Sequence, residues 1–175
     1  MNNIKKKAEN LVRRAGTRNP DDIADYLGLT VYSNLKTRKL LGMYCVKWRH
    51  RMVFLNTNLD NYTRYLVLAH EIGHDQLHRS TARSGLMQEF SLFGTITKTE
   101  YEANIFASHL LIADDDILEN SRLGYSAAQI AAKLGTHEEL VLIKIQELNQ
   151  AGYDLNVAYE PDGSFLRNVA HKLEK

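Results

Sequence analysis

The segment from Tyr62 to His78 constrains the fold of this chain more than any other part of the sequence. It has no proline and a single glycine, and its apolar residues recur at helical spacing. His70 and His74 stand four residues apart in it, so on a helix both side chains lie on one face, one turn apart. Two imidazoles in that arrangement can converge on one ion, and the segment therefore predicts a metal-binding helix.

Glu71 supplies a second part of the same chemistry. It is adjacent to the first histidine, so its carboxylate can reach a water molecule held on the ion. A divalent metal such as zinc lowers the pKa of that water towards neutrality, and the carboxylate accepts its proton as the water attacks a carbonyl. The alternative is a pair of core histidines that bond only to other protein groups. We predict a metal-dependent hydrolase in which Glu71 is the general base.

A catalytic zinc site needs three protein ligands and one open position, so a third donor is expected on another element. Thr97 is placed as the N-cap of a second helix that runs to about Leu111. At roughly 100° per residue, Glu100 shares a face with small and apolar residues, whereas Glu102 points away. Glu100 is the predicted third ligand, and Glu102 is predicted to be solvated and is the next ligand to test. Asn104, one turn after Glu100, is placed to hydrogen-bond a ligating histidine or the carboxylate.

His78 continues the series of histidines but is not a predicted ligand. It lies about 12 Å from His70 along the helix axis, too far for both to bind one small ion. We predict a structural or pocket-lining role for it. The proposed chemistry also needs a donor for the developing oxyanion. Tyr101, His109 and Tyr125 are candidates, and their spacing does not choose among them.

The remaining pattern predicts an α+β fold in a single domain, residues 1–175. We expect N-terminal helices in 1–40, a catalytic core in 41–113 and C-terminal helices in 114–175. The elements are two helices in the first forty residues, the second ending at Gly28; a hairpin over 43–55 with its turn at 48–51; a loop or short pieces over 79–96; short helices near 126–134 and 138–149; and a terminal hairpin beginning at residue 155. Cys45 is predicted to be a packed strand residue.

Composition excludes several classes of protein. Apolar residues make up 44% and charged residues 25% of the 175 residues, which is typical of a globular domain and not of a disordered or membrane protein. The net charge is +1, too balanced for a protein that coats nucleic acid. A single cysteine precludes an intrachain disulfide, and no apolar run resembles a signal peptide or a membrane span. We expect a cytoplasmic protein.

Two segments leave nucleic-acid binding open as an alternative. Residues 125–149 resemble a helix-turn-helix, but its second helix opens with Glu138 and Glu139, which repel phosphate, so we predict scaffold helices. The hairpin carries basic and aromatic residues around Trp48 that could stack on nucleic acid. We favour instead a charged edge strand that pairs with an extended substrate.

The motifs together resemble the ImmA/IrrE family of metallopeptidases. The resemblance is carried by Asn56, by the sequence Leu-Ala-His-Glu-Ile-Gly-His at 68–74, and by Glu-x-x-Ala-Asn-x-Phe-Ala at 100–107, followed by two leucines. The placement of Glu100 is similar to that of the third ligand in gluzincins. The family commonly has Met-Pro after the two leucines, where this chain has Ile112 and Ala113.

The resemblance implies both a fold and an activity. The fold would be a compact minimal gluzincin core with a small antiparallel sheet, an active-site helix and a Glu-bearing helix. The activity would be zinc-dependent endopeptidase cleavage, with manganese as another candidate ion, of a helix-turn-helix repressor from a phage, mobile-element or stress system. The alternative is a DNA-binding or repressor-binding regulator without proteolysis. No membrane partner is expected.

Overall fold

A computed structural model describes residues 3–84, 87–89 and 97–157 of the chain. Helices and strands come in separate groups along the chain, in an α+β fold as predicted. In order they are α1 (Asn3–Ala15), α2 (Pro20–Leu27), β1 (Thr30–Leu35), β2 (Gly42–Lys47), β3 (His50–Asn56), α3 (Asn61–Leu77), α4 (Arg79–Ser84), β4 (Met87–Glu89), α5 (Lys98–Leu111), α6 (Asp114–Arg122), α7 (Ala127–Leu134) and α8 (Glu138–Gln150). None of the helices in these residues is long and apolar enough to cross a membrane.

The sheet is mixed, so the prediction of an antiparallel sheet was wrong. Its strand order is β1-β3-β2-β4, with β1 parallel to β3 and the other two pairs antiparallel. The hairpin strand β3 inserts between β1 and β2, which gives β1 a parallel neighbour. Strand β1 lies within the first forty residues, where only helices were expected. Helix α2 ends as predicted, with Gly28 in the left-handed conformation.

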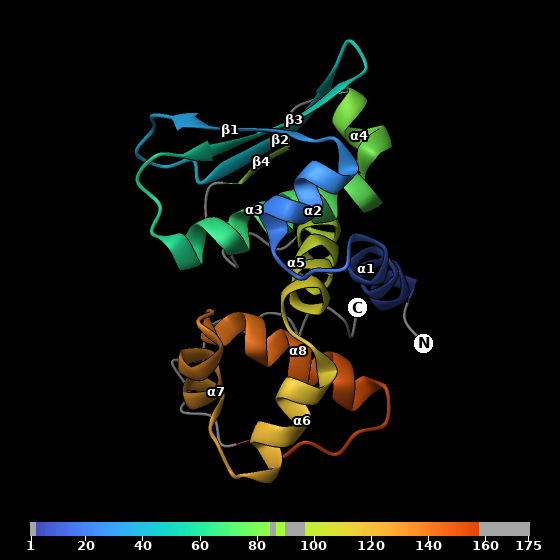
Figure 1. The fold of residues 1–175 in the computed structure, drawn as a ribbon, viewed down its shortest axis with the longest axis vertical. Coiled ribbons are helices and arrows are strands. Elements are labelled where there is room, and N and C mark those ends of the chain that lie inside the picture. Colours follow the sequence, from blue (N-terminus) through green and yellow to red (C-terminus); the bar gives the residue numbers. More distant parts are fainter. Residues whose placement is uncertain (1–2, 85–86, 90–96, 158–175) are drawn as a thin grey trace.

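The predicted hairpin is present, and its turn consists of Trp48 and Arg49. Both have positive φ, 50° and 68°, and the flanking Lys47 and His50 pair across the strands. Neither strand is an outermost strand of the sheet, contrary to the edge-strand prediction, because β3 lies between β1 and β2 and β4 pairs with β2; that last pairing covers Gly42–Tyr44 and not the basic end of the hairpin. Figure 1 shows the end of the hairpin projecting at the top of the molecule, next to α4.

Asn56 closes the hairpin on the side away from the turn. Its side-chain nitrogen donates to the backbone oxygens of Thr37 and Leu40, at 2.8 and 2.7 Å. Its backbone N–H donates to the oxygen of Leu41. These bonds fix the loop that leads into β2, and they therefore fix where Gly42 lies over α3.

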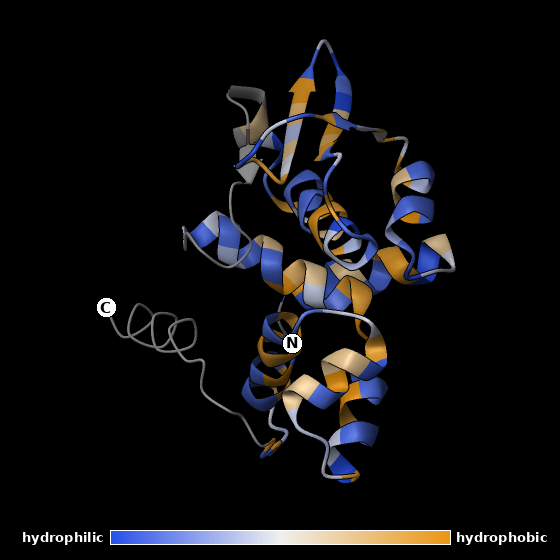
Figure 2. Ribbon diagram, turned by 90° about the vertical axis from the view of Figure 1, so that its left-hand side faces the viewer, coloured by the Kyte–Doolittle hydropathy of each residue, from blue (hydrophilic) through white to orange (hydrophobic). Residues whose placement is uncertain are grey.

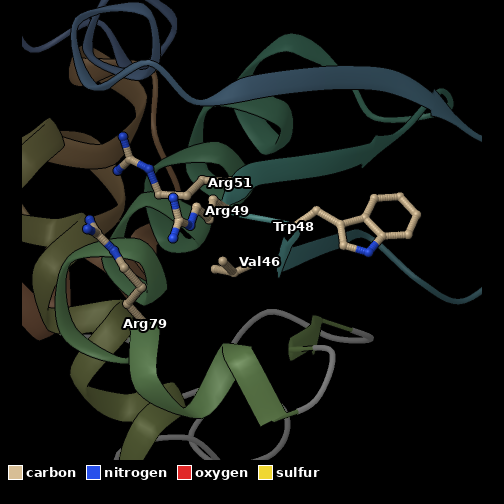
Figure 3. A pocket seen from close by; sticks show the side chains of 5 residues that line it. All are labelled: Val46, Trp48, Arg49, Arg51 and Arg79. Atoms are coloured by element: carbon tan, nitrogen blue, oxygen red, sulfur yellow. The ribbon is translucent and has the colours of Figure 1, made fainter.

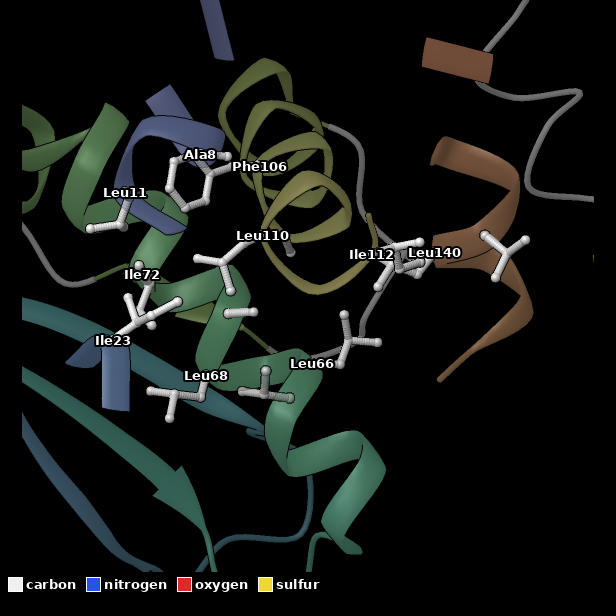
Figure 4. Packing of buried hydrophobic residues seen from close by; sticks show 14 of the residues in the cluster. Ala8, Leu11, Ile23, Leu66, Leu68, Ile72, Phe106, Leu110, Ile112 and Leu140 are labelled. Carbon is white, nitrogen blue, oxygen red and sulfur yellow. The ribbon is translucent and has the colours of Figure 1, made fainter. Parts of the chain in front are cut away.

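Helices α3 and α5 cross closely beneath the sheet. A Cβ on Gly73 would lie 3.1 Å from both Cα and the backbone oxygen of Ala103, so a side chain there would require the two helices to move apart by a few tenths of an ångström. Thr97 caps α5 as predicted, accepting from the N–H of Glu100 at 3.3 Å. Figure 4 shows that side chains of α1, α2, α3 and α5 share one apolar core beside this crossing, and Figure 2 shows apolar residues along the inward faces of the helices.

Helices α6, α7 and α8 lie at the far end of α5 from the sheet (Figure 1). The two short helices predicted near 126–134 and 138–149 are α7 and α8, and α8 packs against α5, α6 and α7. Helix α6 was not predicted, although its three leading aspartates favour a helix N-terminus. The terminal hairpin expected from residue 155 falls mostly outside the described residues, and 155–157 form no strand.

Candidate metal centre

Three side chains from α3 and α5 meet as one group of donors. His70 and His74 are 0% and 2% exposed, and their Nε2 atoms lie 2.9 Å apart. Glu100 Oε2 lies 3.0 Å from Nε2 of His70 and 3.4 Å from Nε2 of His74. Nitrogen and oxygen ligands about 2.0–2.1 Å from a zinc ion stand about 3.3 Å apart in a tetrahedron. The donor set therefore fits a small divalent ion, and the three side chains are those named from the sequence.

Asn104 fixes the orientation of His70. Its Oδ1 lies 2.8 Å from Nδ1 of His70, and an amide oxygen only accepts, so Nδ1 carries the proton. The lone pair of the imidazole is then on Nε2, the atom that faces Glu100 and His74. This is the side-chain contact expected of Asn104, and it leaves His70 in the tautomer that a metal ligand requires.

A second chain of hydrogen bonds reaches His74 from the other side. Nδ1 of His74 lies 3.1 Å from Nδ1 of His78, and Nε2 of His78 lies 2.9 Å from Oε2 of Glu102. Every contact is satisfied when His74 donates to His78 and His78 donates to the carboxylate. The prediction that Glu102 is solvated was wrong, because the helix crossing brings it against His78. Figure 1 shows α5 passing beneath α3.

Glu71 lies on the face of α3 that meets strand β2. Its side chain is buried, and its carboxylate lies against Gly42. A Cβ on Gly42 would stand 2.7 Å from Oε1 of Glu71 and 2.5 Å from Cγ1 of Val67, distances that packed atoms do not adopt. The absence of a side chain at position 42 therefore defines the space for the Glu71 carboxylate. Nothing in the local sequence pattern marks Gly42, because the contact depends on the register of β2 over α3.

The protonation states at the centre match those of metal ligands. Burial lowers the pKa of His74 to about 4, against the opposing effect of the nearby Glu100 carboxylate, so this imidazole is neutral near pH 7. Burial alone would raise the pKa of Glu100, but the adjacent imidazoles of His70 and His74 outweigh it and lower the pKa well below the ordinary range. Divalent ions bind neutral imidazole and ionised carboxylate.

Asp75, the residue after His74, anchors this part of α3 to the sheet. It is 1% exposed and accepts from Tyr44 Oη at 2.7 Å, from Arg51 Nη1 at 2.9 Å and from Arg79 Nη2 at 2.9 Å. Burial raises the pKa of Tyr44 above its usual range, and its hydrogen bond to Asp75 adds to that effect. Sequence reasoning did not single out Asp75, because its partners lie on elements whose pairing only the fold shows.

A second group of donors, Glu9, His109 and Asp114, also comes together within the described part of the chain. The ammonium group of Lys144 lies 2.7 Å from Asp114 Oδ1 and 2.8 Å from His109 Nδ1. This lysine is fully buried and supplies the positive charge that an ion would bring. The group is therefore a buried charge network, which ties α1 and α6 to α8.

The three oxyanion candidates lie in different places. His109 belongs to this charge network, nine residues and about 13 Å along α5 from Glu100. Tyr125 lies on the connection between α6 and α7. Tyr101 is the residue after Glu100 on α5; burial raises its pKa, and the charge of Glu147 on α8 raises it further.

Fold and site together define a class of protein: an α+β chain with the donor set of a metallopeptidase. Residues 24–146 match the peptidase family M78, described as the IrrE N-terminal-like domain. The chain belongs to this family, the ImmA/IrrE peptidases that its motifs resemble.

Two relatives come from a phage and from a bacterium. The uncharacterized immunity region protein 2 of Bacillus phage phi105 is 32% identical over 141 residues, which cover 81% of this chain and 88% of that protein. The metallopeptidase ImmA of Bacillus subtilis (strain 168) is 28% identical over 132 residues, which cover 74% of this chain and 76% of that protein.

Proposed function

We propose that this chain is a zinc-dependent endopeptidase in which His70, His74 and Glu100 hold the ion and Glu71 is the general base. The observation that carries the proposal is the convergence of three ligand atoms, 2.9–3.4 Å apart, from two helices, although His70 and Glu100 are 30 residues apart in the sequence. The peptidase family of the chain supports the same reaction.

The zinc ion would supply a Lewis acid that activates a water molecule and polarises the scissile carbonyl. Glu71 accepts the proton that the water loses and delivers it to the amide nitrogen that leaves. Its position against Gly42 holds the carboxylate on the strand side of α3. The reaction consumes one water molecule and releases two peptides, one with a new carboxylate and one with a new amine.

The surrounding side chains hold the two imidazoles in place. Asn104 orients His70, and the His78–Glu102 pair orients His74. A hydrogen bond of this kind fixes the ring and its tautomer and raises the basicity of the ligating nitrogen. Asn104 and His78 are therefore positioning residues for the metal ligands.

We propose that the substrate is a helix-turn-helix repressor. Support comes from the family of the chain and from the relative named as an immunity region protein of a phage. Such a repressor acts on DNA in the cytoplasm, so we place the reaction there. Manganese is the alternative ion, because carboxylate and imidazole donors bind it as well.

The test is incubation of the purified protein with the product of an adjacent repressor-like gene, with and without a chelator. Mass spectrometry should detect two fragments that share one cut, and the chelator or the Glu71→Gln variant should abolish them. Intact repressor in a stoichiometric, metal-independent complex would refute proteolysis and select the repressor-binding alternative. Salt-dependent retention of DNA without cleavage would select the DNA-binding one.

A further inference from the structure

A hollow of about 700 Å³ lies between the end of the β2–β3 hairpin and the start of α4. It is lined by Val46, Trp48, Arg49, Arg51 and Arg79, and we call it the tip pocket. Figure 3 shows the three arginine side chains grouped at one side of it and the Trp48 ring at the other. Neither the metal centre nor the proposed reaction uses these residues.

The tip pocket is positively charged. Arg51 and Arg79 share the buried carboxylate of Asp75, and Arg49 adds a third, exposed guanidinium group to the lining. Lys47 adds a further cation, with its ammonium group 4.7 Å from the centre of the Trp48 ring. Guanidinium groups bind carboxylates through two parallel hydrogen bonds, so an anionic group fits this hollow.

The backbone at the hairpin turn is costly for the residues it carries. Trp48 and Arg49 both have left-handed φ angles, which turns of this kind normally assign to Asn-Gly. A bulky residue is disfavoured in that conformation because its Cβ comes too close to the following carbonyl oxygen. Trp48 is 82% exposed, so burial of its ring does not offset the cost. Strain of this kind at an exposed aromatic residue points to a role in binding.

The register of β2 over α3 connects the tip pocket to the metal centre. Gly42, Tyr44 and Val46 follow one another at every second residue of β2. Gly42 and Tyr44 meet Glu71 and Asp75 of α3, and Val46 lines the tip pocket together with Arg79, the first residue of α4. Glu71 and Arg79 are eight residues apart, about 12 Å at the helical rise, a distance that three or four residues of extended peptide cover.

We propose that the tip pocket binds an acidic side chain of the protein substrate, three or four residues from the bond that is cut. The proposal rests on the proposed peptidase activity, and it specifies the substrate as a chain with clustered aspartate or glutamate near the cleavage site. A nucleic acid is a poorer occupant, because its phosphates need cations in a row, whereas these cations surround one hollow and one face of Trp48 is covered by Lys47.

The first experiment measures binding without hydrolysis. Trp48 is the single tryptophan of the chain, so its fluorescence reports on the tip pocket directly. The full chain is titrated with a short peptide that contains consecutive glutamates, with the same peptide carrying glutamines, and with oligothymidylate. The glutamate peptide should give a saturable change at an affinity at least about tenfold higher than the glutamine peptide, weakened by salt. Equal binding of the two peptides, or tighter binding of oligothymidylate, would overturn the proposal.

Variants distinguish the effect of charge at the tip pocket on peptide binding from the effect of charge elsewhere on the protein. Arg49→Gln should lower the affinity for the glutamate peptide about tenfold. Arg13→Gln, which removes an exposed guanidinium on α1, should leave that affinity unchanged. The double variant Trp48→Asn, Arg49→Gly should melt at a higher temperature and bind a labelled glutamate peptide poorly. Unchanged binding by Arg49→Gln, or an equal loss in Arg13→Gln, contradicts the assignment.

A second experiment distinguishes failure of the tip-pocket proposal from failure of the proposed peptidase function. Where the chain cleaves its substrate, substitution of acidic residues three or four positions from the cut by their amides should lower kcat/KM at least about tenfold, and substitution of distant ones should not. Cleavage that ignores these residues refutes the tip pocket and leaves the peptidase intact. Absence of cleavage with selective glutamate-peptide binding refutes the peptidase and leaves the anion site.

Discussion

Alanine at position 42 tests whether Glu71 needs the space that Gly42 leaves. The new Cβ would stand 2.7 Å from Oε1 of Glu71 and 2.5 Å from Cγ1 of Val67, whereas packed atoms stand about 3.5–4.0 Å apart. One or both side chains must therefore move by about 1 Å. A displacement of that size at a reacting group costs about a hundredfold in rate, and overpacking costs about 1–3 kcal/mol of stability.

The assay compares kcat/KM, metal content and thermal unfolding of Gly42→Ala with those of the parent protein. We expect kcat/KM to fall about a hundredfold, with metal content unchanged because Gly42 contacts none of the three proposed ligands. Gly16→Ala is the matched control, since its added methyl group meets nothing within 4 Å. It should lose stability through its positive φ and retain activity. Activity within about threefold of the parent in Gly42→Ala would refute this account of how Glu71 is placed.

Three further predictions address the ligands, their partners and the response to acid. Glu71→Gln should retain the metal and lose about a hundredfold or more in kcat, whereas His74→Ala should lose both; elemental analysis and a cleavage assay separate the two, and cleavage by either protein at the parent rate refutes the mechanism. Asn104→Ala and His78→Ala should each weaken metal binding about 10–100-fold, measured by competition with a chelator, and unchanged affinity would show that they do not position the ligands. Burial alone would raise the pKa of Asp114, but its bonds to two lysines lower it from 3.8 to about 2. The lowered pKa contributes at most about 2 kcal/mol of stability above pH 4, which is lost as the pH falls towards 2; Asp114→Asn should flatten that part of the curve in denaturant titrations, and an unchanged curve would contradict it.

Which residues share one face of a helix could be predicted from the sequence without knowledge of the fold. His70 and His74 lie on one face because a helix turns every 3.6 residues, and the same arithmetic selected Glu100 and placed Asn104 on its inward side. The C-terminal end of α2 was predicted from Gly28, and the N-terminal end of α5 was predicted from the cap at Thr97. These features depend on residues a few positions apart, whose relative placement the local backbone geometry sets.

Other contacts were decided by the way the elements pack. The sequence said nothing of Glu102 bonding to His78, of Asp75 joining two arginines and a tyrosine, or of Gly42 standing over Glu71. It also did not reveal that β1 runs parallel to β3. Each of these depends on a strand register or a helix crossing between segments far apart in the chain, and such a choice is made by the burial of the whole core. The amino-acid order alone thus determined which groups we propose for the chemistry, and tertiary packing determined what holds each of them in place.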